Sequence, residues 1–338
     1  MSQLKYIEID HFELASGLNF SLKLSYQHFG LPLNSAPVVL VNHALTGNSQ
    51  VIGEKGWWNG IIGEDKVIDT NNYSVLSFNI PGNGFGNINE DFVKYYKDFT
   101  AKDIARIFVE GLQRLSIHKL FAVIGGSVGG GIAWELSILK PNLIENIIPI
   151  ATDWKATDWL IANCYVQERI LENSRNPIAD ARIHAMTFYR NSLSFKQKFN
   201  RTKASALLFN MESWLNHHGE KLSQRFQLST YKMMNQILKS INVAENKNEF
   251  LNKAKNIKGN IHIITINSDV FFVPNENWET YVELKTVKEN VTINEIKSID
   301  GHDAFLIEFS QISKFLNPIF NKKEKENETS QLSYIGHR

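Results

Sequence analysis

A series of short, continuous apolar segments, each ending in a glycine-rich or polar loop, constrains the fold more than any other feature of this sequence. Their runs of valine, isoleucine and leucine do not alternate with polar residues, which is typical of strands buried on both faces of a parallel sheet. Residues 20–29 differ, because apolar and polar side chains alternate there and predict a half-buried strand. The continuous segments begin at Ala36, Tyr73, Leu120, Ile144 and Ile261.

The segments between these strands have helical spacing. In residues 99–115, Thr100 is a suitable N-cap, Asp103 stands at the capping-box position, and apolar residues recur from Ile104 to Leu112. Strands that alternate with helices form βαβ units with right-handed crossovers. The sequence therefore predicts an α/β fold with a mostly parallel central sheet flanked by helices.

The alternation stops between residues 154 and 254, where helical spacing continues but strand signals are almost absent. We expect this stretch to be an inserted helical cap over the sheet. The core domain would then consist of residues 1–153 and 255–320. Residues 321–338 are polar and rich in charge, and we expect them to form a disordered tail.

Composition excludes several classes of function. The 36 lysine and arginine residues almost balance the 35 acidic residues, so the chain lacks the basic excess that binding to nucleic acid or to an anionic membrane requires. The N-terminal stretch has early acids and no long apolar run, and we expect neither a signal peptide nor a transit peptide. Cys164 is the only cysteine, which excludes an internal disulfide and a cysteine-based zinc site. We expect a cytoplasmic enzyme without a metal.

The sequence Gly-x-Ser-x-Gly, centred on Ser127, lies directly after a predicted strand and directly before a predicted helix. A serine on such a turn is exposed as a nucleophile, and the N-terminus of the following helix favours a developing negative charge. The turn lacks the Gly-Lys-Ser/Thr ending of a phosphate-binding loop and the spacing of a dinucleotide fingerprint. We therefore interpret Ser127 as a catalytic nucleophile.

A serine hydroxyl needs a base, and the base needs an orienting acid. In a sheet with this turn the chain order is nucleophile, acid, base, each at the carboxyl end of a strand. Asp269 follows the strand that begins at Ile261, and His302 follows the last predicted strand, which begins at Val291. Asp153 also follows a strand, and it remains a reserve candidate for the acid.

The other histidines fit the base less well. His184, His217 and His218 lie in the helical insertion, where histidines are more often solvated. His43 precedes the nucleophile, and we expect it to line the site instead. The oxyanion needs two donors, for which we select the backbone N–H groups of Val128 and Leu45.

Six motifs spread over nearly the whole chain resemble those of the homoserine O-acetyltransferase family, which has the α/β-hydrolase fold. Their specificity is collective, although GHDAFL and GWW followed by DTNNY are more particular than Gly-x-Ser-x-Gly. The motifs are NHALTG (42–47), GWWNGIIG with DTNNY (56–73), GGSVGG (125–130), FYRN (188–191), RFQLSTY (225–231) and GHDAFL (301–306).

The resemblance implies a ping-pong reaction in which Ser127 takes an acetyl group from acetyl-CoA and then gives it to the hydroxyl of L-homoserine, a step of methionine biosynthesis. It also implies that Arg190 holds the substrate carboxylate and that Asp303 receives the substrate ammonium. Acetyl-CoA would be a co-substrate, with no permanently bound cofactor. The family's dimers associate through the cap, which favours a homodimer.

Two segments depart from the family pattern. The stretch 80–92 lacks the Gly-Ser-Thr-Gly-Pro sequence that is usual there, and Trp214 and His217 stand where tyrosines are common. Hydrolysis by the same triad is therefore an alternative, as are succinyl-CoA as donor and serine as acceptor. A catalytically silent member that binds a ligand is a third interpretation, but no residue of the triad is missing.

Overall fold

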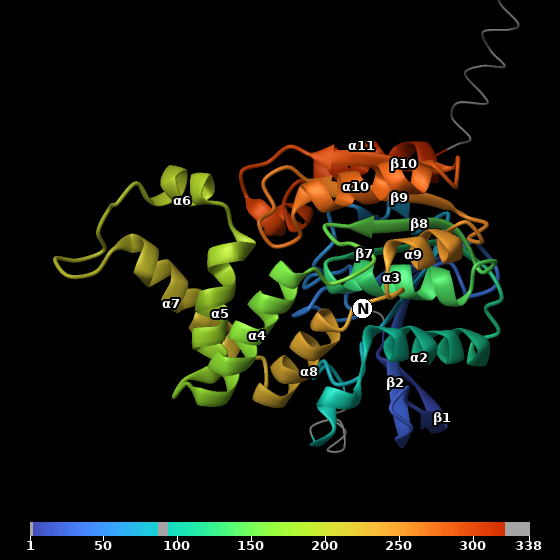
Figure 1. The fold of residues 1–338 in the computed structure, drawn as a ribbon, viewed down its shortest axis with the longest axis horizontal. Coiled ribbons are helices and arrows are strands. Elements are labelled where there is room, and N and C mark those ends of the chain that lie inside the picture. The colour runs from blue at the N-terminus through green and yellow to red at the C-terminus, as the bar shows by residue number, and fades with distance from the viewer. Residues whose placement is uncertain (1–2, 87–93, 322–338) are drawn as a thin grey trace, which may run out of the picture.

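The computed structural model describes residues 3–86 and 94–321, and an eight-stranded sheet forms its centre (Figure 1). The strand order is β1-β2-β6-β3-β7-β8-β9-β10. β2 pairs antiparallel with both β1 and β6, and every pair from β6 to β10 is parallel. The strands are β1 Lys5–Glu13, β2 Asn19–Gly30, β3 Val38–Asn42, β6 Ser74–Phe78, β7 Leu120–Gly126, β8 Ile144–Ile150, β9 Asn260–Ile266 and β10 Val291–Ile296.

The predicted strands and the mostly parallel sheet are confirmed. β3 and β6 are buried at every position, as expected for strands covered on both faces of the sheet. β1 was not expected from the sequence. Its register with β2 shifts between Ile9 and Phe12, and His11 there has a φ of 54°, so an irregularity interrupts the alternation that would have identified the strand.

Each face of the sheet carries its own apolar core. Helices α2 (Ala101–Arg114), α3 (Val128–Leu139) and α10 (Pro274–Lys285) cover one face, while α11 (Phe309–Phe320) and the loop region with the short strands β4 (Ile62–Gly63) and β5 (Ile68–Asp69) cover the other. The predicted capping box of α2 is present, because Thr100 Oγ1 accepts from the N–H of Asp103 and the Asp103 carboxylate accepts from the N–H of Thr100.

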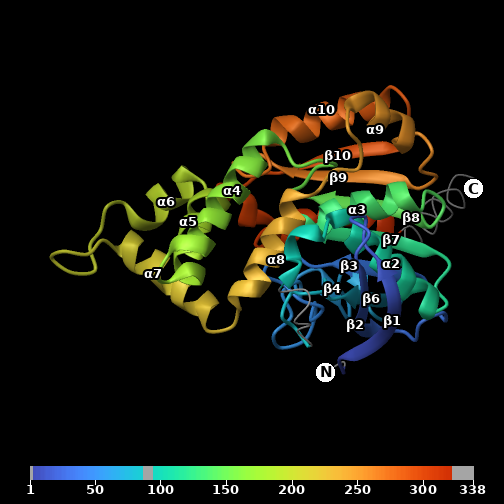
Figure 2. The same cartoon turned by 60° about the horizontal axis from the view of Figure 1, so that its bottom comes forward.

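Five helices project from the sheet on the side of the strands' carboxyl ends (Figures 1 and 2). They are α4 Asp158–Asn173, α5 Pro177–Tyr189, α6 Ser192–Phe199, α7 Asn210–Ser223 and α8 Leu228–Lys239. The two crossings between this cap and the core pair with one another, since Lys155 and Asn242 form an isolated antiparallel bridge. The second crossing therefore lies before the expected boundary at Ala254, and α9 (Lys247–Ala254) stands on the core side of it.

Phe250 explains the position of α9. Its ring stacks on Trp154 with a centroid distance of 4.3 Å and meets Trp134 of α3 edge-on at 5.8 Å, which holds α9 against the core. The expected tail and residues 87–93 lie outside the described residues. Among the helices that are described, none combines the length and the apolar character that a membrane crossing requires.

Candidate active site

Ser127 occupies a strained turn between β7 and α3. Its φ and ψ angles are 56° and −127°, a conformation that non-glycine residues rarely adopt. Its N–H donates to the carbonyl of Ile150 in β8 at 2.9 Å, which anchors the turn to the sheet. Such strain is typical of a nucleophile held at the end of a strand.

Close packing around the turn requires glycine on both sides of Ser127. A Cβ on Gly129 would lie 2.4 Å from the carbonyl oxygen of Asn42, so α3 starts directly against the end of β3. A Cβ on Gly126 would lie 2.5 Å from the ring of Phe305, which follows the predicted base in the chain. The glycines thus let the segments that carry the nucleophile, the oxyanion loop and the base approach one another.

The predicted acid and base form a buried pair. His302 Nδ1 lies 2.6 Å from Asp269 Oδ2, and both side chains are almost fully inaccessible. Asp269 Oδ1 accepts from the N–H groups of Phe271 and Phe272 at 2.7 and 2.9 Å. Three hydrogen bonds therefore hold the carboxylate in one orientation, and it in turn orients the imidazole.

Aromatic rings surround the imidazole of His302. The rings of Tyr189, Phe271, Phe272 and Phe305 lie between 5.2 and 5.6 Å from it, centroid to centroid. The Nε2 atom is buried and has no hydrogen-bond partner within the described part of the chain. With Nδ1 engaged by the carboxylate, Nε2 is the position at which His302 can accept a proton.

The reserve acid Asp153 has other partners. Its carboxylate accepts from the hydroxyl of Thr280 at 3.0 and 3.1 Å and from the N–H of Trp154 at 2.7 Å. Burial raises the pKa of Asp153 to about 7. Asp269, and not Asp153, is the carboxylate bound to His302.

His43 lies beneath the loop that carries Leu45. Its Nε2 accepts from the N–H of Ile80 at 2.9 Å, which places the ring proton on Nδ1, where it donates to the carbonyl of Ala44 at 2.8 Å. Burial lowers the pKa of His43 to about 4, so the ring is neutral at physiological pH. His43 thus links the loop that carries Leu45 to Ile80 by hydrogen bonds at both ring nitrogens.

Two backbone amides remain available as oxyanion donors. Val128 is the first residue of α3, so its N–H has no intrahelical acceptor. Leu45 lies in a turn that the N–H of Gly47 closes on the carbonyl of Ala44 at 2.9 Å. Neither amide has a hydrogen-bond partner among the residues that the structure describes, and their role as donors stays a prediction.

The two predicted substrate-binding residues contact each other. Arg190 Nε lies 3.1 Å from Asp303 Oδ2, and Arg190 Nη1 lies 2.6 Å from Asp300 Oδ1. Burial raises the pKa of Asp303, while nearby arginines, among them Arg190, oppose that effect. The second carboxylate on Arg190, from Asp300, was not anticipated from the sequence.

Three further residues near the site were not predicted from the sequence. Arg182 lies over the ring of Tyr189 at 5.4 Å, and Arg225 Nη1 donates to the carbonyl of Thr46, beside Leu45, at 3.1 Å. Trp58 Nε1 donates to the carbonyl of Phe305 at 3.2 Å and so holds the 3₁₀ helix that carries His302, Gly301–Leu306. Trp58 and Arg225 belong to the motifs GWW and RFQLSTY, but a motif alone does not predict which groups its side chains contact.

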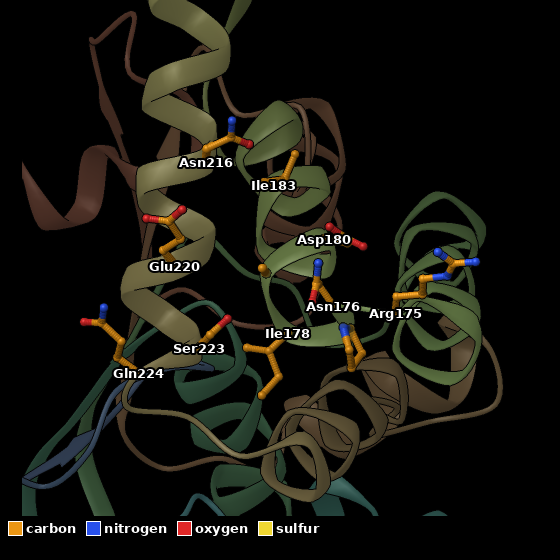
Figure 3. A pocket seen from close by; sticks show the side chains of 11 residues that line it. Arg175, Asn176, Ile178, Asp180, Ile183, Asn216, Glu220, Ser223 and Gln224 are labelled. Carbon is orange, nitrogen blue, oxygen red and sulfur yellow. The ribbon is translucent and has the colours of Figure 1, made fainter.

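Two histidines of the cap have partners other than these residues, and one cavity of the cap lies apart from them. His184 bonds to Gln167 within the cap, and His218 packs on Trp214. A cavity of about 590 Å³ lies between α5 and α7, and the side chains labelled in Figure 3 line it; none of the predicted site residues is among them. No cluster of three or more metal-ligating side chains occurs in residues 3–86 and 94–321.

Comparison with known proteins agrees with this geometry. A family model described as the alpha/beta hydrolase fold matches residues 37–293. A homoserine O-acetyltransferase of Trichormus variabilis is 32% identical over 332 residues, which cover 90% of each chain.

The crystal structure of homoserine O-acetyltransferase from Bacillus anthracis has a TM-score of 0.85 at 19% identity and covers 95% of this chain and 98% of its own. The structure of esterase E22 has the same TM-score at 16% identity, covering 95% and 100%, so these two likenesses concern the fold alone. The chain therefore belongs to the homoserine O-acetyltransferase family of the α/β-hydrolase fold.

Proposed function

We propose that this enzyme transfers an acetyl group from acetyl-CoA to the hydroxyl of L-homoserine through an acetyl-Ser127 intermediate. The observation that carries the proposal is the buried pair of His302 and Asp269, with Nε2 of His302 free of any partner among the described residues. Ser127 directly follows β7 at the carboxyl end of that strand. The sequence relationship to homoserine O-acetyltransferases supports this reaction over others that the same triad can perform.

In the first half-reaction, Ser127 Oγ attacks the thioester carbonyl and His302 Nε2 takes the hydroxyl proton. The N–H groups of Val128 and Leu45 stabilise the oxyanion. The carbon–sulfur bond then breaks, and the proton on His302 passes to the sulfur, so that CoA leaves as a thiol. The carboxylate of Asp269 stabilises the imidazolium through its 2.6 Å contact.

In the second half-reaction, the hydroxyl of homoserine attacks acetyl-Ser127 and gives its proton to His302 Nε2. When the acyl–serine bond breaks, that proton returns to Ser127 Oγ and O-acetyl-L-homoserine is released. A transferase must exclude water at this stage. The rings of Tyr189, Phe271, Phe272 and Phe305 around His302 supply an apolar wall suited to that purpose.

Arg190 and Asp303 would hold the amino acid. The guanidinium is planar and can bind a carboxylate through two N–H groups, while the Asp303 carboxylate can accept from an ammonium. In the structure they neutralise one another, and Asp300 adds a second carboxylate. A zwitterionic acceptor would bring one charge of each sign to this cluster and leave its net charge unchanged.

Thiol release with acetyl-CoA or succinyl-CoA, each with and without L-homoserine or L-serine, tests the function. Release that requires homoserine and yields O-acetyl-homoserine by mass supports it. Release that ignores the acceptor, or cleavage of simple esters alone, would assign hydrolysis to the triad. Burial raises the pKa of Cys164 to about 12, so this thiol adds little background to a thiol reagent.

We further propose that the enzyme is a cytoplasmic homodimer that associates through the cap. Helix α4 exposes several large apolar side chains, of which Trp159 and Tyr165 are 52% and 57% accessible. Exposed aromatic residues on one helix are characteristic of interfaces. Sedimentation equilibrium of the wild type and of Tyr165→Glu tests this proposal, and a monomeric wild type would contradict it.

A further inference from the structure

The segment from residue 191 to residue 210 is strongly basic. It contains four cationic side chains and no acidic residue. All four are exposed, and none forms an ion pair with a described carboxylate; Lys198, Arg201 and Lys203 instead lie over aromatic rings. The chain as a whole is nearly neutral, so this local charge is unusual. The four residues are Lys196, Lys198, Arg201 and Lys203.

A groove of about 390 Å³ adjoins this segment. It lies between α6, α7 and the loop that precedes His302, and Lys198 is its cationic lining residue on α6. Its aromatic side is made by Phe195, Phe199 and Trp214, whose ring centroids lie 5.6 to 6.3 Å apart. Lys198 Nζ lies 4.7 Å from the ring centroid of Trp214. An aromatic surface beside unpaired cations suits a base joined to phosphates.

The inner end of the groove is formed by the residues predicted to bind the acceptor and their neighbours. Arg190 and Asp300 line it, and Arg190 also contacts Asp303, the neighbour of His302. Because two carboxylates neutralise Arg190, this inner end offers no net positive charge. The groove is therefore positive at its outer end and uncharged or slightly negative at Arg190 and Asp300. An acyl-CoA has the same polarity, with phosphates on the nucleotide at one end and an uncharged arm leading to the thioester.

The cavity between α5 and α7 lacks this complementarity. Figure 3 shows the carboxylates of Asp180 and Glu220 among its lining side chains, together with Arg175. The carboxylates of Asp180 and Glu220 would repel phosphates. Of these two cavities of the cap, the groove beside α6 is the one that fits a polyphosphate ligand.

We infer that the groove between α6 and α7 binds the nucleotide end of the acyl-CoA donor, with the adenine against Trp214 and the phosphates at Lys198 and Arg201. This inference rests on the proposed function and identifies where the donor enters. The pantetheine arm would pass Arg190 and Asp300 to reach Ser127.

The test compares two acetyl donors in the double variant Lys198→Glu/Arg201→Glu. Acetyl-CoA contains the nucleotide, whereas S-acetylpantetheine lacks the nucleotide and its phosphates. We expect the KM for acetyl-CoA to rise about tenfold or more, because two exposed attractions become repulsions, while kcat/KM for S-acetylpantetheine stays unchanged. Lys221→Glu, at the far end of α7, is the matched control, because it reverses an exposed cation that is not part of the groove.

Other results would contradict the groove inference, the proposed function or both. Suppose that the wild type uses acetyl-CoA. The groove inference alone is then wrong if the KM of the double variant for acetyl-CoA is unchanged or equals that of Lys221→Glu. It is also wrong if kcat/KM falls equally for acetyl-CoA and S-acetylpantetheine. If the wild type releases no thiol from acetyl-CoA, both the groove inference and the proposed function fail. Added salt should raise the wild-type KM for acetyl-CoA and leave that for S-acetylpantetheine unaffected.

Discussion

Replacing Asp269 by asparagine should disable His302 without disturbing the fold. The N–H groups of Phe271 and Phe272 donate to Asp269 Oδ1, so an asparagine keeps its carbonyl oxygen in that place. The NH₂ group of the asparagine then faces His302 Nδ1, in the place of Asp269 Oδ2, which lies 2.6 Å from Nδ1 in the wild type. Nδ1 must become an acceptor, which moves the ring proton to Nε2. A protonated Nε2 cannot accept the proton of Ser127.

The expected loss in kcat is about 10⁴-fold, which corresponds to about 5 kcal/mol of transition-state stabilisation. The KM values should change much less, because Asp269 is buried behind His302 and takes its hydrogen bonds from protein groups. The same loss should appear in both half-reactions, since His302 transfers a proton in each.

The assay is thiol release under saturating acetyl-CoA and homoserine, with Asp153→Asn as the matched control. Both residues are buried aspartates that follow strands. Because burial raises the pKa of Asp153 to about 7, its protonated form is already accessible, and asparagine imitates that form. We expect kcat of Asp153→Asn to stay within about threefold of the wild type. A fall in this variant as large as in Asp269→Asn, or substantial turnover by Asp269→Asn, would show that turnover does not depend on the pairing of Asp269 with His302.

Three other substitutions test separate parts of the molecule. Ser127→Ala should abolish turnover and remove the acetyl-enzyme detected by intact-protein mass spectrometry, while the melting temperature stays unchanged. Turnover by this variant at the wild-type rate would show that Ser127 is not the nucleophile. Arg190→Lys should raise the KM for the acceptor about tenfold or more and that for the donor much less, because a point charge replaces a planar fork; equal effects in steady-state kinetics would contradict its role. Burial raises the pKa of Glu135 to about 7 from 4.5, so its contribution to stability is complete below pH 4.5 and is lost as the pH rises through 7, by up to about 3 kcal/mol. Glu135→Gln should therefore reduce the fall in unfolding free energy between pH 5 and pH 8 in urea titrations, and an unchanged pH dependence would show that Glu135 does not titrate as described.

Features that depend on neighbours in the chain could be predicted from the sequence. The strand that leads to Ser127 and the glycines around it occupy one short segment, and the capping box of α2 needs only Thr100 and Asp103. Periodicity and turn chemistry act over a few residues, so they can be recognised without the fold. The order of Ser127, Asp269 and His302 followed from the topology of a parallel sheet.

Contacts between distant segments were decided by the tertiary structure. Both Asp153 and Asp269 follow strands, and only packing joins the second of them to His302. The tertiary structure also joins Arg190 to Asp300, 110 positions away, and packs α9 against the core through Phe250. Local backbone preferences and hydrophobic periodicity were enough to predict strands β2, β3 and β6 to β10, the turn at Ser127 and the chain order of Ser127, Asp269 and His302. The partners of buried charges depend on the folded chain, because a charge removed from water pairs with whichever group the fold brings within reach.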